Sequence, residues 1–116
     1  MAAPDSTSER AMETHEDELL DRIVAAIRTV YDPEISTNIY DLGLIYAVDM
    51  VGEHDIAIRM TLTAPGCPVA GILPGQVERA VESVDGVDRC HVELVWDPPW
   101  TKDRMSDEAK LELGML

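Results

Sequence analysis

The stretch DIAIRMTL, residues 55–62, decides the fold of this 116-residue chain. Its apolar residues Ile56, Ile58, Met60 and Leu62 occupy every second position, and most of the residues between them are polar. Because side chains of a strand alternate between its two faces, this pattern predicts a half-buried antiparallel β-strand. An apolar sheet face has to be covered by a second layer of secondary structure.

Two further strands are predicted around this central one. The first covers residues 44–51 and is joined to the central strand by a turn at residues 52–55. The second covers residues 87–96, after Gly86 has ended the preceding helix. The positions expected to face the core in these two strands are Leu44, Tyr46, Val48, Met50, Cys90, Val92, Leu94 and Trp96.

Helical periodicity accounts for most of the remaining chain. Apolar residues at three- and four-residue spacing predict a helix from Asp17, which Pro33 terminates. A second helix follows residue 68, and Pro74-Gly75 predicts a kink or a late start there. A short helix over residues 106–113 has Ser106 as its expected cap. The inward positions expected in the first two helices are Leu19, Leu20, Ile23, Val24, Ile27, Val30, Tyr31, Val69, Ile72, Leu73, Val77, Ala80, Val81 and Val84.

The expected fold is therefore a small α/β (α+β) domain in the order αββαβ(α), with a three-stranded sheet and helices packed on one face. We expect a single domain over residues 15–116, because the length suits one domain and no repeat is visible. Residues 1–14 are small, polar and charged, and are expected to form a disordered arm.

The net charge of −14 argues against whole classes of partner. A nucleic-acid-binding protein needs a basic surface, and an anionic membrane would repel this chain. No apolar run approaches the roughly 20 residues that span a bilayer, and the N-terminus has no secretory apolar region. Cytoplasmic localisation is the expectation. The acidity itself suits either solubility or a basic partner.

Cys67 is the most promising reactive residue. It precedes Pro68, and proline favours the first position of a helix, so Cys67 is expected at the N-cap. A sulfur there faces unpaired backbone donors and the positive end of the helix dipole, which favour the reactive thiolate. The alternative is a small cap residue without chemistry.

Cys90 alternates in register with core positions and is expected to be a buried structural residue. His15, His54 and His91 are expected on the surface. The sequence has no CxxC motif, no HExxH motif and no histidine pair at helical spacing. We therefore expect no tightly bound metal, and at most transient iron at Cys67.

Two further sets of residues stay open between a functional and a structural role. The acids Asp32, Glu34 and Asp41 share one loop and could orient a partner or ligate a metal, or only solvate the loop. Thr63, expected with Thr61 on the polar face of the central strand, could hydrogen-bond a thiolate or cap the following loop.

The segment WDPPW, residues 96–100, is stiffened by two prolines. The strand register turns Trp96 inward. Trp100 lies beyond the strand and is expected to bind a partner, since tryptophan is common at interface hot spots.

Three segments together resemble a known family: DPEISTNIYDLGLIY (residues 32–46), MTLTAPGCPVAGILP (residues 60–74) and VELVWDPPWTKDRMS (residues 92–106). The chain resembles the SufT and PaaD-like proteins, which include the eukaryotic cytosolic iron–sulfur targeting factor and the N-terminal extensions of some bacterial cluster-carrier ATPases. The resemblance covers roughly residues 17–116. The phenylacetate-degradation branch carries a cysteine-rich zinc-binding extension that this sequence lacks, which favours the SufT-like branch.

The resemblance implies a non-enzymatic role in iron–sulfur cluster assembly or delivery, as in the SUF system. It implies that Cys67 is the reactive cysteine, with Asp32, Glu34, Asp41 and Thr63 around it. The implied partners are cluster scaffold or carrier proteins and apo-protein clients, the implied cargo is transient iron or a cluster, and the expected state is a monomer or weak homodimer. Two alternatives remain: an accessory protein of a multicomponent oxygenase, and a cysteine-dependent enzyme with a distant base such as His54.

Overall fold

The computed structural model describes residues 18–33, 35–63 and 71–114, which form an α+β domain. The predicted disordered arm, Glu34 and Cys67 lie outside these ranges. A first helix occupies residues 18–27. The later elements are β1 (Ile45–Met50), β2 (Asp55–Met60), α2 (Leu73–Glu82), β3 (Arg89–Leu94), the 3₁₀ turn η2 (Lys102–Arg104) and α3 (Asp107–Glu112). The predicted αββαβα order is confirmed.

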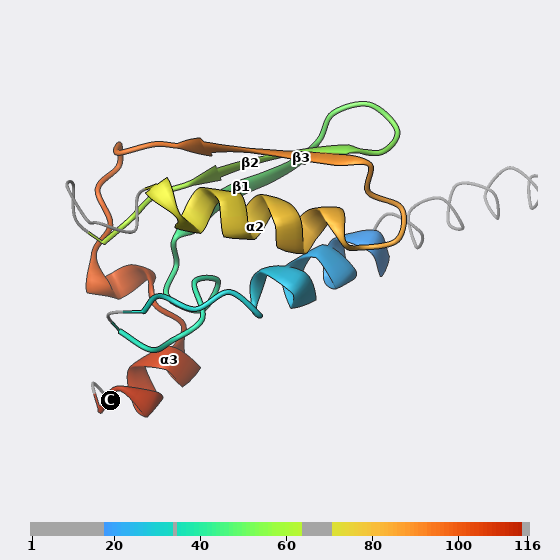
Figure 1. The fold of residues 1–116 in the computed structure, drawn as a ribbon. Helices are drawn as coiled ribbons and strands as arrows, with labels where there is room; N and C mark the ends of the chain where they lie inside the picture. Colours follow the sequence, from blue (N-terminus) through green and yellow to red (C-terminus); the bar gives the residue numbers. More distant parts are fainter. Residues whose placement is uncertain (1–17, 34, 64–70, 115–116) are drawn as a thin grey trace, which may run out of the picture.

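The sheet has the strand order β1-β2-β3, with β2 in the centre. β2 is antiparallel to β1 and parallel to β3. Parallel strands need a crossover connection, and α2 provides it between β2 and β3. The first helix and α2 lie on the same side of the sheet, as predicted, whereas α3 lies away from the sheet, next to the C-terminus of the chain (Figure 1).

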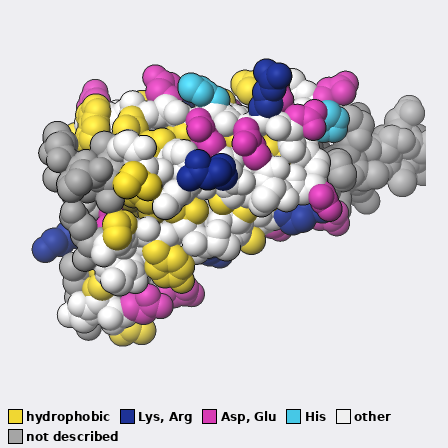
Figure 2. Space-filling model, viewed as in Figure 1, with side chains coloured by type: hydrophobic (Ala, Val, Ile, Leu, Met, Phe, Trp, Pro, Cys, Tyr) yellow, Lys and Arg dark blue, Asp and Glu magenta, His cyan; other side chains and the backbone are white. Residues whose placement is uncertain are grey.

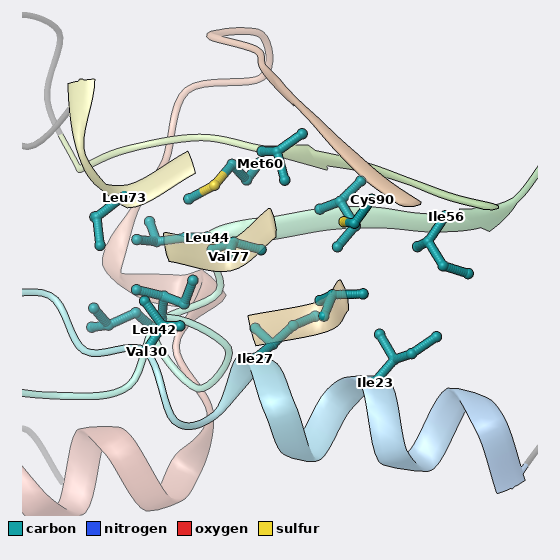
Figure 3. Packing of buried hydrophobic residues seen from close by; sticks show 14 of the residues in the cluster. Ile23, Ile27, Val30, Leu42, Leu44, Ile56, Met60, Leu73, Val77 and Cys90 are labelled. Carbon is teal, nitrogen blue, oxygen red and sulfur yellow. The ribbon is translucent and has the colours of Figure 1, made fainter. Parts of the chain in front are cut away.

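The core forms where the first helix and α2 pack against the apolar face of the sheet, to which β2 contributes every second side chain. Ile56, Ile58, Met60 and Leu62 are each at most 2% exposed, which confirms the predicted alternation. Figure 3 shows side chains from the first helix, α2 and the sheet converging on one another. Burial of each such side chain contributes about 1.5–3 kcal/mol.

β1 contains an irregularity that its sequence pattern did not reveal. Ile45 pairs with Met60 but Ala47 pairs with Arg59, so Tyr46 is an extra residue in the strand. Ile45 packs against the core in place of the predicted Tyr46, and Met50 at the far end of β1 is 39% exposed. The prediction that Tyr46 and Met50 face the core is therefore wrong.

α2 starts late, as Pro74 predicted. Its N-cap is Ile72 and the proline lies in the first turn, where its missing N–H costs no hydrogen bond. Leu73, Val77 and Val81 are buried as expected. Ile72 is 55% exposed, which corrects its predicted inward position, because it precedes the helix and does not share its periodicity.

Two glutamates of α2 close the outer edge of β3. Glu82 accepts a hydrogen bond from the backbone N–H of Cys90 at 3.0 Å, and Glu78 accepts one from the N–H of Val92 at 2.9 Å. The two glutamates are one helical turn apart, and the two N–H groups are two residues apart on one edge of the strand. The two carboxylates thus occupy backbone N–H groups of β3 that an exposed edge strand would otherwise offer to another chain.

The C-terminal segment, residues 100–109, holds the loop that precedes β1. The indole N–H of Trp100 donates to the carbonyl of Leu42 at 2.7 Å, and the N–H of Ser106 donates to the carbonyl of Asp41 at 2.8 Å. Gly43 has φ of +81°, and a Cβ there would collide with the backbone carbonyl of Arg104. Only glycine satisfies both conditions at this position.

The short C-terminal helix is capped as predicted. The hydroxyl of Ser106 accepts a hydrogen bond from the N–H of Ala109 at 3.1 Å. Met105 and Ala109 are buried, at 5% and 1% exposure, so the segment also belongs to the core.

The surface shown in Figure 2 intersperses acidic side chains with a few basic ones, and no extended basic patch is visible on that face. Within the described ranges, no helix is both long enough and apolar enough to cross a membrane.

Trp96 and Trp100 lie in environments opposite to those predicted. Trp96 is 42% exposed, whereas Trp100 packs against the core. β3 pairs with β2 only as far as Leu94, so strand alternation no longer fixes the direction of Trp96. The expected inward position of Trp96 is wrong, and the expected partner-binding role of Trp100 loses the exposed position on which it rested.

Replacing Trp100 with alanine should lower the free energy of unfolding by about 3 kcal/mol, because it removes core packing and leaves the Leu42 carbonyl without its donor. Trp96→Ala should cost less than about 1 kcal/mol. Urea denaturation of both variants provides the comparison. A larger loss for Trp96→Ala than for Trp100→Ala would contradict the observed packing.

Candidate functional site

The predicted site falls partly within the described structure. Asp32, Asp41 and Thr63 are described, whereas Glu34 and Cys67 are not. The N-cap of α2 is Ile72. Cys67 lies outside the described residues, so its predicted place at a helix N-terminus stays a prediction.

Asp32 lies at the start of the loop between the first helix and β1 and is 1% exposed. Its carboxylate accepts a hydrogen bond from the N–H of Ile35 at 3.3 Å. Its backbone N–H donates to the carbonyl of Thr37, and its carbonyl accepts from Ser36. Burying a carboxylate costs free energy unless it is hydrogen-bonded. These contacts therefore hold both the Asp32 side chain and the backbone of the loop in place.

Asp41 lies at the other end of the same loop and is held by two side chains. The amide of Asn38 donates to its carboxylate at 2.8 Å, and Arg28 from the end of the first helix lies 3.4 Å away. The N–H of Asp41 returns a hydrogen bond to the Asn38 side chain at 2.9 Å. The guanidinium of Arg28 also lies over the ring of Tyr40, at 5.0 Å from its centroid. The carboxylate of Asp41 is thus paired with a cation and held in one direction.

The end of β2 brings Thr63 toward this loop. The N–H of Thr61 donates to the carbonyl of Leu44 at 2.8 Å, where the loop enters β1. Thr63, two residues later and half-buried, leads directly into residues 64–70. Thr61 is fully buried, which corrects its predicted place on a polar face. The structure therefore brings the acidic loop and the strand that leads toward Cys67 to the same end of the sheet.

The described part of this arrangement can orient polar groups, but by itself it does not form a closed metal site. Within residues 18–33, 35–63 and 71–114, no three His, Cys, Asp or Glu side chains gather closely enough to hold a metal ion. His54 and His91 have side chains 53% and 82% exposed, which confirms their predicted surface positions.

Cys90 is buried as predicted, at 6% exposure, and its sulfur points into the core in Figure 3. Burial, together with the smaller effect of the nearby carboxylates of Glu78 and Glu82, raises the pKa of its thiol from 9.0 to about 12. The thiol is therefore neutral and unreactive at physiological pH.

Sequence reasoning missed the roles of Glu78 and Glu82. Their one signal is position: each directly follows an inward valine, Val77 or Val81, and so borders the apolar stripe of α2. A carboxylate at such a border can reach an adjacent strand edge.

These features define a class of protein: a small α+β domain with a three-stranded mixed sheet and an acid-containing loop held at one end. The crystal structure of a domain of unknown function, DUF59, from Bacillus anthracis shares this fold with a TM-score of 0.79. It is 37% identical, and the match covers 86% of this chain and 95% of that one. A family model described as iron–sulfur cluster assembly protein matches residues 20–94. The chain belongs to that family, which confirms the resemblance stated from the sequence.

Two curated relatives match over nearly their whole length. A protein of Porphyromonas gingivalis is 50% identical over 105 residues, which cover 90% of this chain and 95% of the relative. A protein of Bacillus subtilis is 43% identical over 100 residues, covering 86% and 98%. Both are named Fe-S protein maturation auxiliary factors.

The raised pKa of Cys90 predicts a loss of stability at alkaline pH. Between pH 9 and 12 the unfolded chain releases the thiol proton while the native chain retains it, so stability falls as pH rises. At pH 10 this contribution is about 1.4 kcal/mol. Urea denaturation at pH 7.5 and pH 10 should therefore show a larger loss for the wild type than for Cys90→Ala, in which the other titrating groups are the same. Equal losses in both proteins would contradict the burial of the thiol.

Proposed function

We propose that this protein is a non-enzymatic accessory factor that assists iron–sulfur cluster assembly or the delivery of clusters to apo-proteins. The observation that carries this proposal is family membership across residues 20–94, a range that contains the whole acidic loop and Cys67. The names of the two full-length relatives, maturation auxiliary factors, point to the same role. Its partners would be scaffold or carrier proteins and apo-protein clients.

Cys67 is the proposed contact for iron, sulfide or a client thiol. Support comes from the end of the sheet at which its segment begins: Thr63 follows β2 there, next to the loop that carries Asp32 and Asp41. Glu34 belongs to that loop in sequence and is proposed to act with them. The cargo would be held briefly, with these acids orienting it or its carrier.

A cysteine-dependent enzyme is disfavoured by the position of His54, the base considered from the sequence. His54 precedes β2 and Thr63 follows it, so the six residues of β2 separate the two by about 20 Å. His54 Nδ1 is instead 3.2 Å from the carbonyl oxygen of Gly86. An enzymatic thiol is commonly activated by a base within hydrogen-bonding reach, and His54 does not supply one near Thr63.

Genetic complementation tests the proposal. In a host lacking its own copy of this gene, wild-type protein and Cys90→Ala should restore the activity of iron–sulfur enzymes relative to their protein level, whereas Cys67→Ser should not. Cys90→Ala is the matched control, because it also removes one thiol but from the core. Normal iron–sulfur enzyme activity in the host without any copy would overturn the proposed function. Full rescue by Cys67→Ser would overturn only the role of the cysteine.

Alkylation of the native protein gives an independent measurement. Iodoacetamide at pH 7.5 should label Cys67 at least tenfold faster than Cys90, because the pKa of the buried Cys90 thiol is about 12. Peptide mass spectrometry reports both sites in one sample. Preferential labelling of Cys90 would reject Cys67 as the reactive thiol.

A further inference from the structure

The two edges of the sheet differ in what they offer another chain. The outer N–H groups of β3 at Cys90 and Val92 are occupied by Glu82 and Glu78. The other edge strand, β1, has no such cover among the described residues. Natural proteins usually obstruct exposed edges, so one protected edge beside one open edge calls for an explanation.

The register shows which backbone groups of β1 face outward. The N–H of Val51 donates to the carbonyl of Asp55, so this opposed pair is hydrogen-bonded. Antiparallel pairs alternate between bonded and non-bonded, and Val48 pairs with Ile58 while Met50 pairs with Ile56. The backbone groups of Val48 and Met50 therefore point away from β2, toward the open edge.

An apolar groove runs beside this edge. It has a volume of about 250 Å³ and lies between the first helix and β1. Leu20 at its border is 40% exposed, and Met50 on the edge strand is 39% exposed. The residues lining the groove carry no charge: Leu20, Val24, Tyr40, Ile45, Tyr46, Ala47 and Val48.

We propose that the β1 edge binds an extended segment of a partner protein, which adds to the sheet as a fourth strand. Its backbone would pair with the outward groups of Val48 and Met50, and every second side chain would be apolar and enter the groove. Main-chain hydrogen bonds give affinity in this mode of recognition, and the pockets for alternate side chains give specificity. The site does not depend on the proposed function or on Cys67.

The negative charge of the chain indicates which kind of segment the β1 edge binds. The chain carries a net charge of −14, and Asp49 in β1 and Glu53 in the following turn are exposed near the edge. A second copy would bring an equal negative charge to the same edge, which disfavours β1 pairing with itself. A segment with Lys or Arg on both sides of its apolar residues is complementary and is attracted over a distance. The proposed ligand is therefore an alternating apolar strand with basic flanks.

A phage-displayed library of random twelve-residue peptides, selected against the full chain, is the probe. Enriched peptides should share alternating apolar residues and basic flanks. Their affinities are then measured by fluorescence anisotropy. Met50→Pro should weaken binding at least tenfold more than Met50→Ala, because both remove the side chain but only proline removes the outward N–H. The Met50 N–H is not used in the β1–β2 ladder, so proline is compatible with this edge position.

If Met50→Pro does not fold, the variant Leu20→Glu tests the proposal instead, and Leu111→Glu is its control. Leu111 is 67% exposed on α3 and does not line the groove. Leu20→Glu should weaken binding at least tenfold, and Leu111→Glu should not change it. The proposal is overturned if no peptides are enriched, if enriched peptides bind Leu20→Glu normally, or if sedimentation shows a dimer that Met50→Pro dissociates.

Discussion

The interaction on which the structure depends is the burial of one face of β2. Every second side chain of this strand leaves water, and a three-stranded sheet cannot cover its own apolar face. The first helix and α2 are both placed against that face (Figure 3). The parallel pairing of β3 follows as well, because a helix that crosses the buried face returns the chain in the same direction as β2.

Around this central strand, one end of the sheet and its two edges are built differently. One end of the sheet collects the acidic loop, the exit of β2 and the C-terminal segment, and these hold each other through the carbonyls of Asp41 and Leu42. The β3 edge is occupied by carboxylates of its own crossover helix. The β1 edge and its groove remain, and the groove adjoins the candidate site at Tyr40, over whose ring the guanidinium of Arg28 lies. The proposed partner strand would therefore lie beside the acidic loop.

The sequence predicted the features that rest on periodicity or on local chain chemistry. The alternation in β2, the late start of α2 at Pro74 and the cap at Ser106 are all local signals. It failed where tertiary pairing decides the outcome. The extra residue at Tyr46 breaks the period of β1, and the end of pairing at Leu94 frees Trp96 from the period of β3. For the site, the loop acids were identified from their clustering and from the family pattern, but the contacts of Asp41 with Asn38 and Arg28 require the fold to be known.

The anchoring of the loop by residues 100–109 has a consequence for synthesis. A ribosome makes the loop at residues 32–44 early, yet the donors for the Leu42 and Asp41 carbonyls and the backbone that packs on Gly43 emerge only after β3 is finished. A nascent chain that has completed all three strands therefore still lacks these contacts, although the hydrogen bonds that join the loop to Val30 and Thr61 and the pairing of Asp41 with Arg28 can already form. Chains that terminate after β3 would lack the contacts from residues 100–109 permanently.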